Sequence, residues 1–187
     1  MNREVRVRIV CEDRLSERFL GSLCERFHLR VIDVDVAPSG RGAGSNWVTK
    51  RYPGAVKLRR AQRHQANLGL LVHIDGDDCG VEGRKRELDH ALEDGGLPPR
   101  EASERIAVLV PTWCTEAWLL HLSGIAQPPE SEKLKRNPVS AYQSELRRLA
   151  SDTTATIKAA VQAWPSSAIP SLSDGHEELQ QVLPQAG

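Results

Sequence analysis

The stretch Leu70–Cys79, with the sequence LLVHIDGDDC, joins an apolar run directly to a cluster of acids. Three of the four residues that follow Ile74 are aspartates, namely Asp75, Asp77 and Asp78. A short apolar run bounded by a turn signal is typical of a strand buried in a parallel sheet, and Gly76 supplies that signal. For an Asp-Gly-Asp sequence alone, an ordinary turn is the simpler interpretation.

The rest of the first 124 residues alternates between strand and helix patterns. Strands are predicted at residues 5–10, 31–36, 68–74 and 106–110. Helices are predicted from a cap at Ser16 to Phe27, at 55–65 after a break at Pro53-Gly54, at 81–92 and at 116–122. Because strands and helices alternate, we expect an α/β fold of Rossmann type, with a mainly parallel four-stranded sheet flanked by helices. Alternating Asp33 and Asp35 place the second strand at a sheet edge.

After residue 124 the alternation of strand and helix patterns ends. Weak helical patterns occur near 140–150, 153–164 and 174–183, and no strand pattern is evident. We therefore predict a catalytic domain at 1–124 and a helical C-terminal extension at 125–187, which is either separate or part of the same domain.

Acids follow three of the four predicted strands. In a parallel sheet the carboxyl ends of the strands lie at one edge, where ligands bind. Several carboxylates meeting there without a cation would raise one another's pKa, and hard oxygen ligands suit Mg²⁺ or Mn²⁺. This pattern predicts a metal site formed by Glu12, Asp75, Asp77, Asp78 and Glu116. An EF-hand loop beginning at Asp75 is excluded because Cys79 and Arg86 occupy ligand positions.

A basic tract precedes the acidic cluster. The 39 residues from 36 to 74 contain no Asp or Glu, whereas about five would be expected from the average composition. The seven bases of this tract are Arg41, Lys50, Arg51, Lys57, Arg59, Arg60 and Arg63. Such an imbalance predicts a surface that attracts a polyanion such as nucleic acid, although an ordinary solvated helix face is the plainer alternative. Trp47 and Tyr52 could stack on bases or simply pack.

Bulk composition excludes other classes. The 25 basic and 25 acidic residues give no net charge, and no P-loop motif occurs. No apolar stretch approaches a membrane span, and charged residues interrupt any secretory signal. Four cysteines without a C-x-x-C pair are typical of free thiols in a reducing compartment, so we expect a cytoplasmic protein.

A glutamate after the first strand and D-x-D after the third resemble the signature of the TOPRIM fold. VCEDRLSERFL and VPTWCTEAWLL are similar to motifs of small OLD-like and abortive-infection TOPRIM nucleases, and IPSLSDGHEEL is similar to their C-terminal ends. The resemblance implies that Glu12 is the TOPRIM glutamate, that Asp75 and Asp77 are the metal-binding pair, and that Glu116 is the additional acid of this branch. Asp13 replaces a glycine of the pattern, so the roles of Asp13 and Glu17 stay open.

The resemblance implies a metal-dependent nuclease that hydrolyses phosphodiester bonds of DNA or RNA, with tRNA among the substrates. It also implies an antiviral defence role under control of a separate ABC-type ATPase, because this chain has no ATPase motif. The alternative is a non-catalytic TOPRIM-like binding or regulatory subunit of an ATPase complex. The C-terminal helices at 125–187 are expected to form either the docking surface for this partner or a contact in a homo-oligomer.

Overall fold

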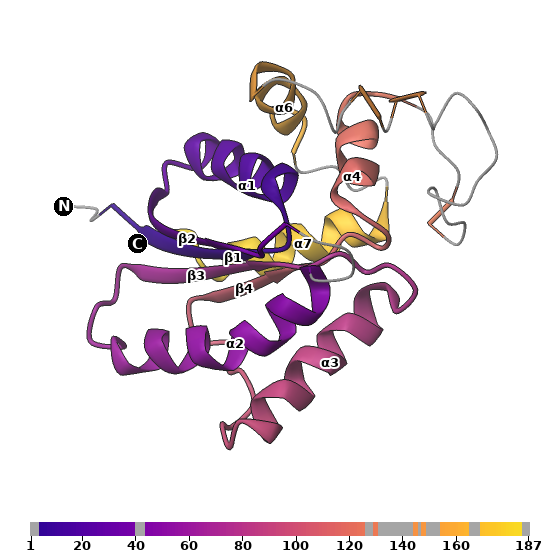
Figure 1. Ribbon diagram of the computed structural model, residues 1–187. Helices are drawn as coiled ribbons and strands as arrows, with labels where there is room; N and C mark the ends of the chain where they lie inside the picture. Colours follow the sequence, from indigo (N-terminus) through magenta and orange to yellow (C-terminus); the bar gives the residue numbers. More distant parts are fainter. Residues whose placement is uncertain are drawn as a thin grey trace.

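The computed structural model describes residues 4–39, 44–125, 129–130, 144–145, 147–148, 154–164 and 169–184. Figure 1 shows an α/β arrangement of strands and helices in these residues. The strands are β1 (Arg6–Cys11), β2 (Arg30–Val36), β3 (Leu68–His73) and β4 (Ile106–Leu109). The helices are α1 (Arg14–Arg26), α2 (Gly44–Ala61), α3 (Gly80–Asp94), α4 (Thr115–Leu122), α6 (Thr154–Val161) and α7 (Pro170–Gln180). The predicted helix near 140–150 lies largely outside the described residues.

The four strands form one parallel sheet in the order β2-β1-β3-β4, which confirms the predicted fold class. The chain leaves β1 toward β2 on one side and then crosses to β3 on the other side. The gap between β1 and β3 is therefore the topological switch point, where ligands bind in open α/β sheets. The prediction that the second strand lies at an edge is confirmed, and its Asp33 is exposed.

Two apolar clusters cover the two faces of the sheet. All six residues of β3 are buried, because helices pack on both sides of it. Residues of α1, α4, α6 and α7 form one cluster with the strands, and residues of α2 and α3 form the other. Figure 1 shows the sheet between these two helical layers. The extension helices α6 and α7 thus share the core of the first 124 residues.

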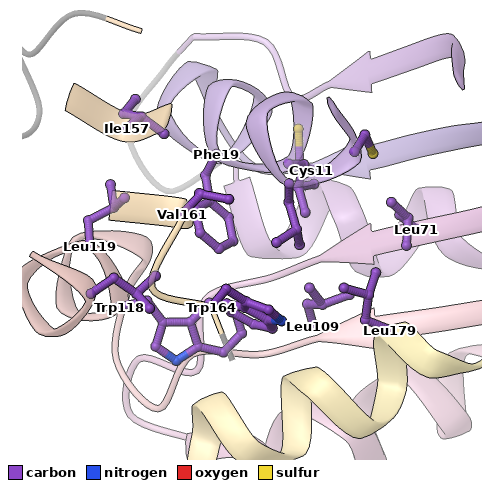
Figure 2. Close-up of a cluster of buried hydrophobic side chains, with 14 of the residues drawn as sticks. Cys11, Phe19, Leu71, Leu109, Trp118, Leu119, Ile157, Val161, Trp164 and Leu179 are labelled. Atoms are coloured by element: carbon purple, nitrogen blue, oxygen red, sulfur yellow. The ribbon is translucent and has the colours of Figure 1, made fainter. Parts of the chain in front are cut away.

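Three aromatic rings pack together within the first cluster, among aliphatic side chains (Figure 2). The ring centroids of Trp118 and Trp164 lie 5.4 Å apart, and Phe19 lies 5.8 Å and 6.0 Å from them. The buried imidazole of His73 completes the group, with its centroid 5.9 Å from that of Trp118. Because His73 is the last residue of β3, this group of packed rings lies beneath the chain just before Asp75. His73 is fully buried, so its imidazole belongs to the core.

Several predicted helix boundaries are wrong. Helix α2 ends at Ala61 rather than at 65, and α7 begins at Pro170 rather than at 174. Helix α2 continues through Pro53 rather than beginning after it. A proline inside a helix costs about 3 kcal/mol, but Val48, Tyr52 and Val56 are all buried at a spacing of four residues and hold the helix on the sheet across the proline. Tyr52 is consequently a core residue and does not offer a stacking surface.

The first helix is capped by Asp13 and not by Ser16. The Asp13 carboxylate accepts a hydrogen bond from the Ser16 backbone N–H at 2.8 Å. A carboxylate is favoured at this position because the helix N-terminus carries a partial positive charge. Ser16 lies inside the helix, and its buried hydroxyl is available for another contact.

Helix α7 is fixed to the sheet by the buried carboxylate of Glu178. It accepts hydrogen bonds from the Val108 backbone N–H at 3.0 Å, from Arg100 Nη2 at 2.9 Å and from Lys85 Nζ at 3.0 Å. Burial alone would raise the pKa of Glu178, but the hydrogen bonds and charge of Arg100 bring this pKa below its usual value.

The described residues include no helix long and apolar enough to cross a membrane.

Candidate active site at the sheet switch point

Glu12 and Asp75 follow β1 and β3, the two strands that flank the switch point. Glu12 Oε1 accepts a hydrogen bond from the Asp75 backbone N–H at 2.8 Å. Two acids that are 63 positions apart in the sequence are therefore in direct contact. This contact forms because parallel register aligns the ends of the two strands.

The Asp75 carboxylate is oriented by hydrogen bonds from Thr115, the first residue of α4. It is buried, and its Oδ1 accepts hydrogen bonds from the Thr115 backbone N–H at 3.1 Å and from the Thr115 hydroxyl at 3.4 Å. The Thr115 hydroxyl also lies 3.0 Å from the Ser16 hydroxyl and 3.5 Å from His73 Nε2. These buried polar groups join α1, α4 and the end of β3 at one point.

The turn after Asp75 is clamped to the segment that follows β4. The Gly76 N–H donates to the Pro111 carbonyl at 2.9 Å, and the Asp77 N–H donates to the Trp113 carbonyl at 3.0 Å. A Cβ at position 76 would lie 2.3 Å from the Thr112 carbonyl oxygen, so only glycine fits. Asp77 has a φ of 48°, a left-handed conformation that is rare outside glycine. The chain turns after Gly76, whose carbonyl accepts hydrogen bonds from the Cys79 and Gly80 N–H groups, and Asp77 is exposed to solvent.

Glu12 has an unusual protonation equilibrium. Burial raises the pKa of its carboxyl to about 7. The hydrogen bond from Asp75 and the charge of Arg84 lower this pKa, while the charges of Asp77 and Asp13 raise it. A carboxyl that titrates near neutrality in a pocket is a candidate catalytic group.

Glu12 also borders an open pocket of about 580 Å³. Glu116 and Asp13 line it from α4 and α1, and the segment after β2 lines its opposite side. A Cβ at Gly44, the first residue of α2, would lie 2.6 Å from Glu12 Oε2. The pocket therefore gives a ligand access to Glu12, past a backbone that approaches this carboxylate closely.

The structure brings some of the predicted metal ligands together more closely than others. Glu12 contacts Asp75, and Asp77 is near enough to influence the charge of Glu12. Glu116 reaches the same pocket from α4, and Asp78 is exposed in the turn before α3. Among the described residues, no three His, Cys, Asp or Glu side chains are grouped closely enough to hold an ion by themselves.

The donors nevertheless fit Mg²⁺ or Mn²⁺. These ions prefer hard oxygen ligands, and Mg²⁺ commonly binds through one or two carboxylates, with water and substrate phosphate completing its coordination. Glu12 and Asp75 each supply a carboxylate at this end of the sheet, although Glu12 contacts the Asp75 backbone N–H and the Asp75 carboxylate contacts Thr115. Burial is the main reason that the pKa of Glu12 is raised, and a nearby cation would favour its charged form. A closed cage made only of protein side chains does not fit this arrangement.

The described bases of the predicted basic tract do not form one surface next to Glu12, because they are spread along the length of α2 and two of them pair with acids. Over the 15 residues from Gly44 to Arg59 a helix extends about 22 Å, so the bases at the end of α2 lie far from Glu12. Arg60 forms a two-pronged ion pair with Glu104, and Arg51 donates to Asp35 at 2.7 Å. Burial lowers the pKa of Arg59. Lys50, Lys57 and Arg63 are exposed, and Arg41 lies outside the described residues.

Two polar residues beside the candidate site were not predicted to lie there from the sequence. Thr115 contacts the Asp75 carboxylate, and the Ser16 hydroxyl contacts that of Thr115. Thr115 directly precedes Glu116, and Ser16 lies four residues after Glu12. Their proximity to predicted site residues was the available signal, but contact between them depends on how α1 and α4 pack.

No family model, curated protein or solved structure matches this chain.

Proposed function

We propose that this protein is a divalent-metal-dependent nuclease that hydrolyses phosphodiester bonds of DNA or RNA. The observation that carries the proposal is the contact between Glu12 and Asp75 across the switch point of a parallel sheet. Ligands bind at this position in such folds, and the motif resemblance to TOPRIM nucleases supports the same residues.

In this proposal Asp75, Asp77 and Glu12 hold the ion, and Glu116 supports them from α4. When bound, the ion would activate a water molecule and stabilise charge on the phosphoryl group. Glu12 is suited to move a proton, because a pKa of about 7 lets its carboxyl both accept and release one near neutral pH. Thr115 keeps the Asp75 carboxylate oriented toward α4.

The exposed bases Lys50, Lys57 and Arg63 are the residues of the basic tract best placed to attract a nucleic acid backbone. Arg51 and Arg60 contribute less to this attraction, because each already pairs with an acid. The proposed setting, antiviral defence under control of a separate ABC-type ATPase in the cytoplasm, rests on the motif resemblance alone.

The test is cleavage of duplex DNA, single-stranded DNA, single-stranded RNA and tRNA in Mg²⁺ or Mn²⁺. We expect Glu12→Ala and Asp75→Asn to reduce cleavage at least about a thousandfold, since each removes a group that acts on the reacting atoms. Asp89→Asn, which changes an exposed acid on α3, is the matched control and should retain full activity. Cleavage that is unchanged in Glu12→Ala would remove Glu12 from the mechanism.

The alternative is a non-catalytic TOPRIM-like subunit of an ATPase complex. The burial of Asp75 favours it, because a buried carboxylate is less accessible to an ion. Calorimetry with Mn²⁺ distinguishes the two functions. A nuclease should show binding that Asp75→Ala abolishes, whereas a purely structural cluster should show no binding in either protein.

A further inference from the structure

Arg84 is a buried cation beside the candidate active site. Its residue exposure is 5%, and it lies near the start of α3. The side chain donates from Nε to the Asp75 carbonyl at 3.0 Å and from Nη1 to Glu87 Oε2 at 2.5 Å. Because a buried guanidinium is costly unless it is paired, these contacts explain how Arg84 is kept there.

Glu87 is itself held by α2, the helix that carries most of the basic tract. Its Oε1 accepts a hydrogen bond from the Thr49 hydroxyl at 3.1 Å. Thr49, Glu87 and Arg84 thus form a continuous chain of contacts from α2 to the Asp75 backbone. These contacts restrict rotation of the Arg84 guanidinium and so orient its remaining nitrogen, Nη2.

The remaining nitrogen, Nη2, faces Asp77. Its distance to Asp77 Oδ2 is 3.7 Å, which is an ion-pair contact but too long for a hydrogen bond. The Asp77 side chain is 46% exposed, so this end of the guanidinium lies beside a carboxylate that reaches solvent. The positive charge is also near enough to Glu12 to lower the pKa of that carboxyl.

We propose that Arg84 Nη2 binds a non-bridging oxygen of the substrate phosphodiester, while Nε holds the Asp75–Asp77 turn in place. This inference rests on the proposed function and assigns the residue that contacts the substrate anion. A phosphodiester approaching Glu12, Asp75 and Asp77 meets strong negative charge, and a fixed guanidinium offsets part of it. Guanidinium groups are well matched to phosphate oxygens in geometry and charge.

The experiment compares wild type with Arg84→Lys and Arg84→Ala. Arg86→Lys and Arg86→Ala on the exposed side of α3 are the matched controls. Binding of a short fluorescent single-stranded oligonucleotide is measured by anisotropy in Ca²⁺, and cleavage of the same oligonucleotide is measured in Mg²⁺. Mn²⁺ affinity by calorimetry and thermal midpoints report whether the turn and the fold survive each substitution.

We expect both Arg84 variants to weaken oligonucleotide binding about tenfold or more, and both Arg86 variants to change it less than about threefold. Mn²⁺ affinity should change less in Arg84→Lys than oligonucleotide affinity does. Millimolar guanidinium should partly restore oligonucleotide binding and cleavage by Arg84→Ala.

Equal binding by the Arg84 and Arg86 variants overturns the inference. So does a loss of oligonucleotide binding that is matched by an equal loss of Mn²⁺ affinity, since Arg84 would then act only on the turn. If wild type binds the oligonucleotide but cleaves nothing, the proposed nuclease function fails while the binding comparison still decides the role of Arg84. If wild type does not bind the oligonucleotide, both fail.

Discussion

Glu12 Oε1 accepts a hydrogen bond from the Asp75 backbone N–H at 2.8 Å, which joins the ends of β1 and β3. The same glutamate has a pKa of about 7 because it is buried beside other acids. One carboxylate thus connects two strand ends and carries an unfavourable charge at neutral pH. This combination makes the behaviour of the site with pH and with metal directly testable.

Glu12→Gln should stabilise the metal-free protein at alkaline pH. The folded pKa of Glu12 is raised above its ordinary value of 4.5, so its contribution to stability is fully present below 4.5 and is lost as pH rises through about 7. At pH 8 in a chelator we expect the variant to melt higher by roughly 7–14 °C, and at pH 4 the two proteins should melt together. A lower midpoint for the variant at pH 8 would contradict this.

Mg²⁺ should stabilise the folded protein at alkaline pH, where the charge of Glu12 destabilises the metal-free protein. An ion that binds the folded protein raises its thermal midpoint by mass action. At pH 8 we expect Mg²⁺ to stabilise wild type but not Asp75→Asn. Equal shifts in the two proteins would place the ion elsewhere.

Thr115→Val should weaken metal binding without removing a proposed ligand. Its hydroxyl lies between Asp75, Ser16 and His73, and losing it frees the Asp75 carboxylate to rotate. Residues that orient a ligand typically change metal affinity about 10–100-fold. Calorimetry with Mn²⁺ measures the effect, Thr115→Ser should restore most of it, and Thr154→Val on α6 is the exposed control. Unchanged affinity in Thr115→Val would show that the hydroxyl does not orient Asp75.

His73→Phe should reduce the acid sensitivity of the fold. Burial lowers the pKa of His73 from 6.5 to about 4. Between these pH values the histidine is protonated in the unfolded chain but neutral in the folded protein. Stability from this residue is present above pH 6.5 and is lost as pH falls toward 4, by roughly 2–4 kcal/mol. Urea unfolding of wild type and variant between pH 7 and 4 measures the two slopes, and parallel slopes would rule this explanation out.

Gly76→Ala should destabilise the protein and disturb the site together. The added Cβ would lie 2.3 Å from the Thr112 carbonyl oxygen and 2.6 Å from that of Pro111, and forced contacts of this kind cost about 1–3 kcal/mol. Gly54→Ala is the matched control, because a Cβ there meets nothing within 4 Å and should stabilise α2 by about 0.5–1 kcal/mol. Urea unfolding at neutral pH measures both changes. Equal stability of the two variants would show that the turn can move away from the strand.

Glu178→Gln should release α7 from the sheet. Its carboxylate is buried among Arg100, Lys85 and the Val108 N–H, and breaking a buried ion pair costs about 3–5 kcal/mol. The pKa of Glu178 is lowered, so this contribution is present above 4.5 and is lost as pH falls through the folded pKa. The exposed neighbour provides the control Glu177→Gln. Urea unfolding in which the two variants were equally stable at pH 7 would contradict the assigned role.

The strand–helix alternation and the acids at the strand ends were predictable, because each depends on a local pattern. Apolar runs such as 68–74 identify buried strands wherever they pack, and a following Asp-Gly identifies a turn. The continuity of α2 through Pro53 was not predictable in the same way, since the local propensity of proline opposes it and only packing of Val48 and Val56 overrides it.

The sequence by itself therefore determined which segments are strands, where each ends and which ends carry acid. Only the tertiary structure decided that β1 lies beside β3, so that Glu12 touches Asp75, and that Arg51 and Arg60 of the basic tract are paired with distant acids. It also decided that Arg84 is buried behind the turn. The physical reason is that periodicity and turn chemistry act between residues close in the chain. Strand order and ion pairing depend instead on how surfaces far apart in the chain pack together.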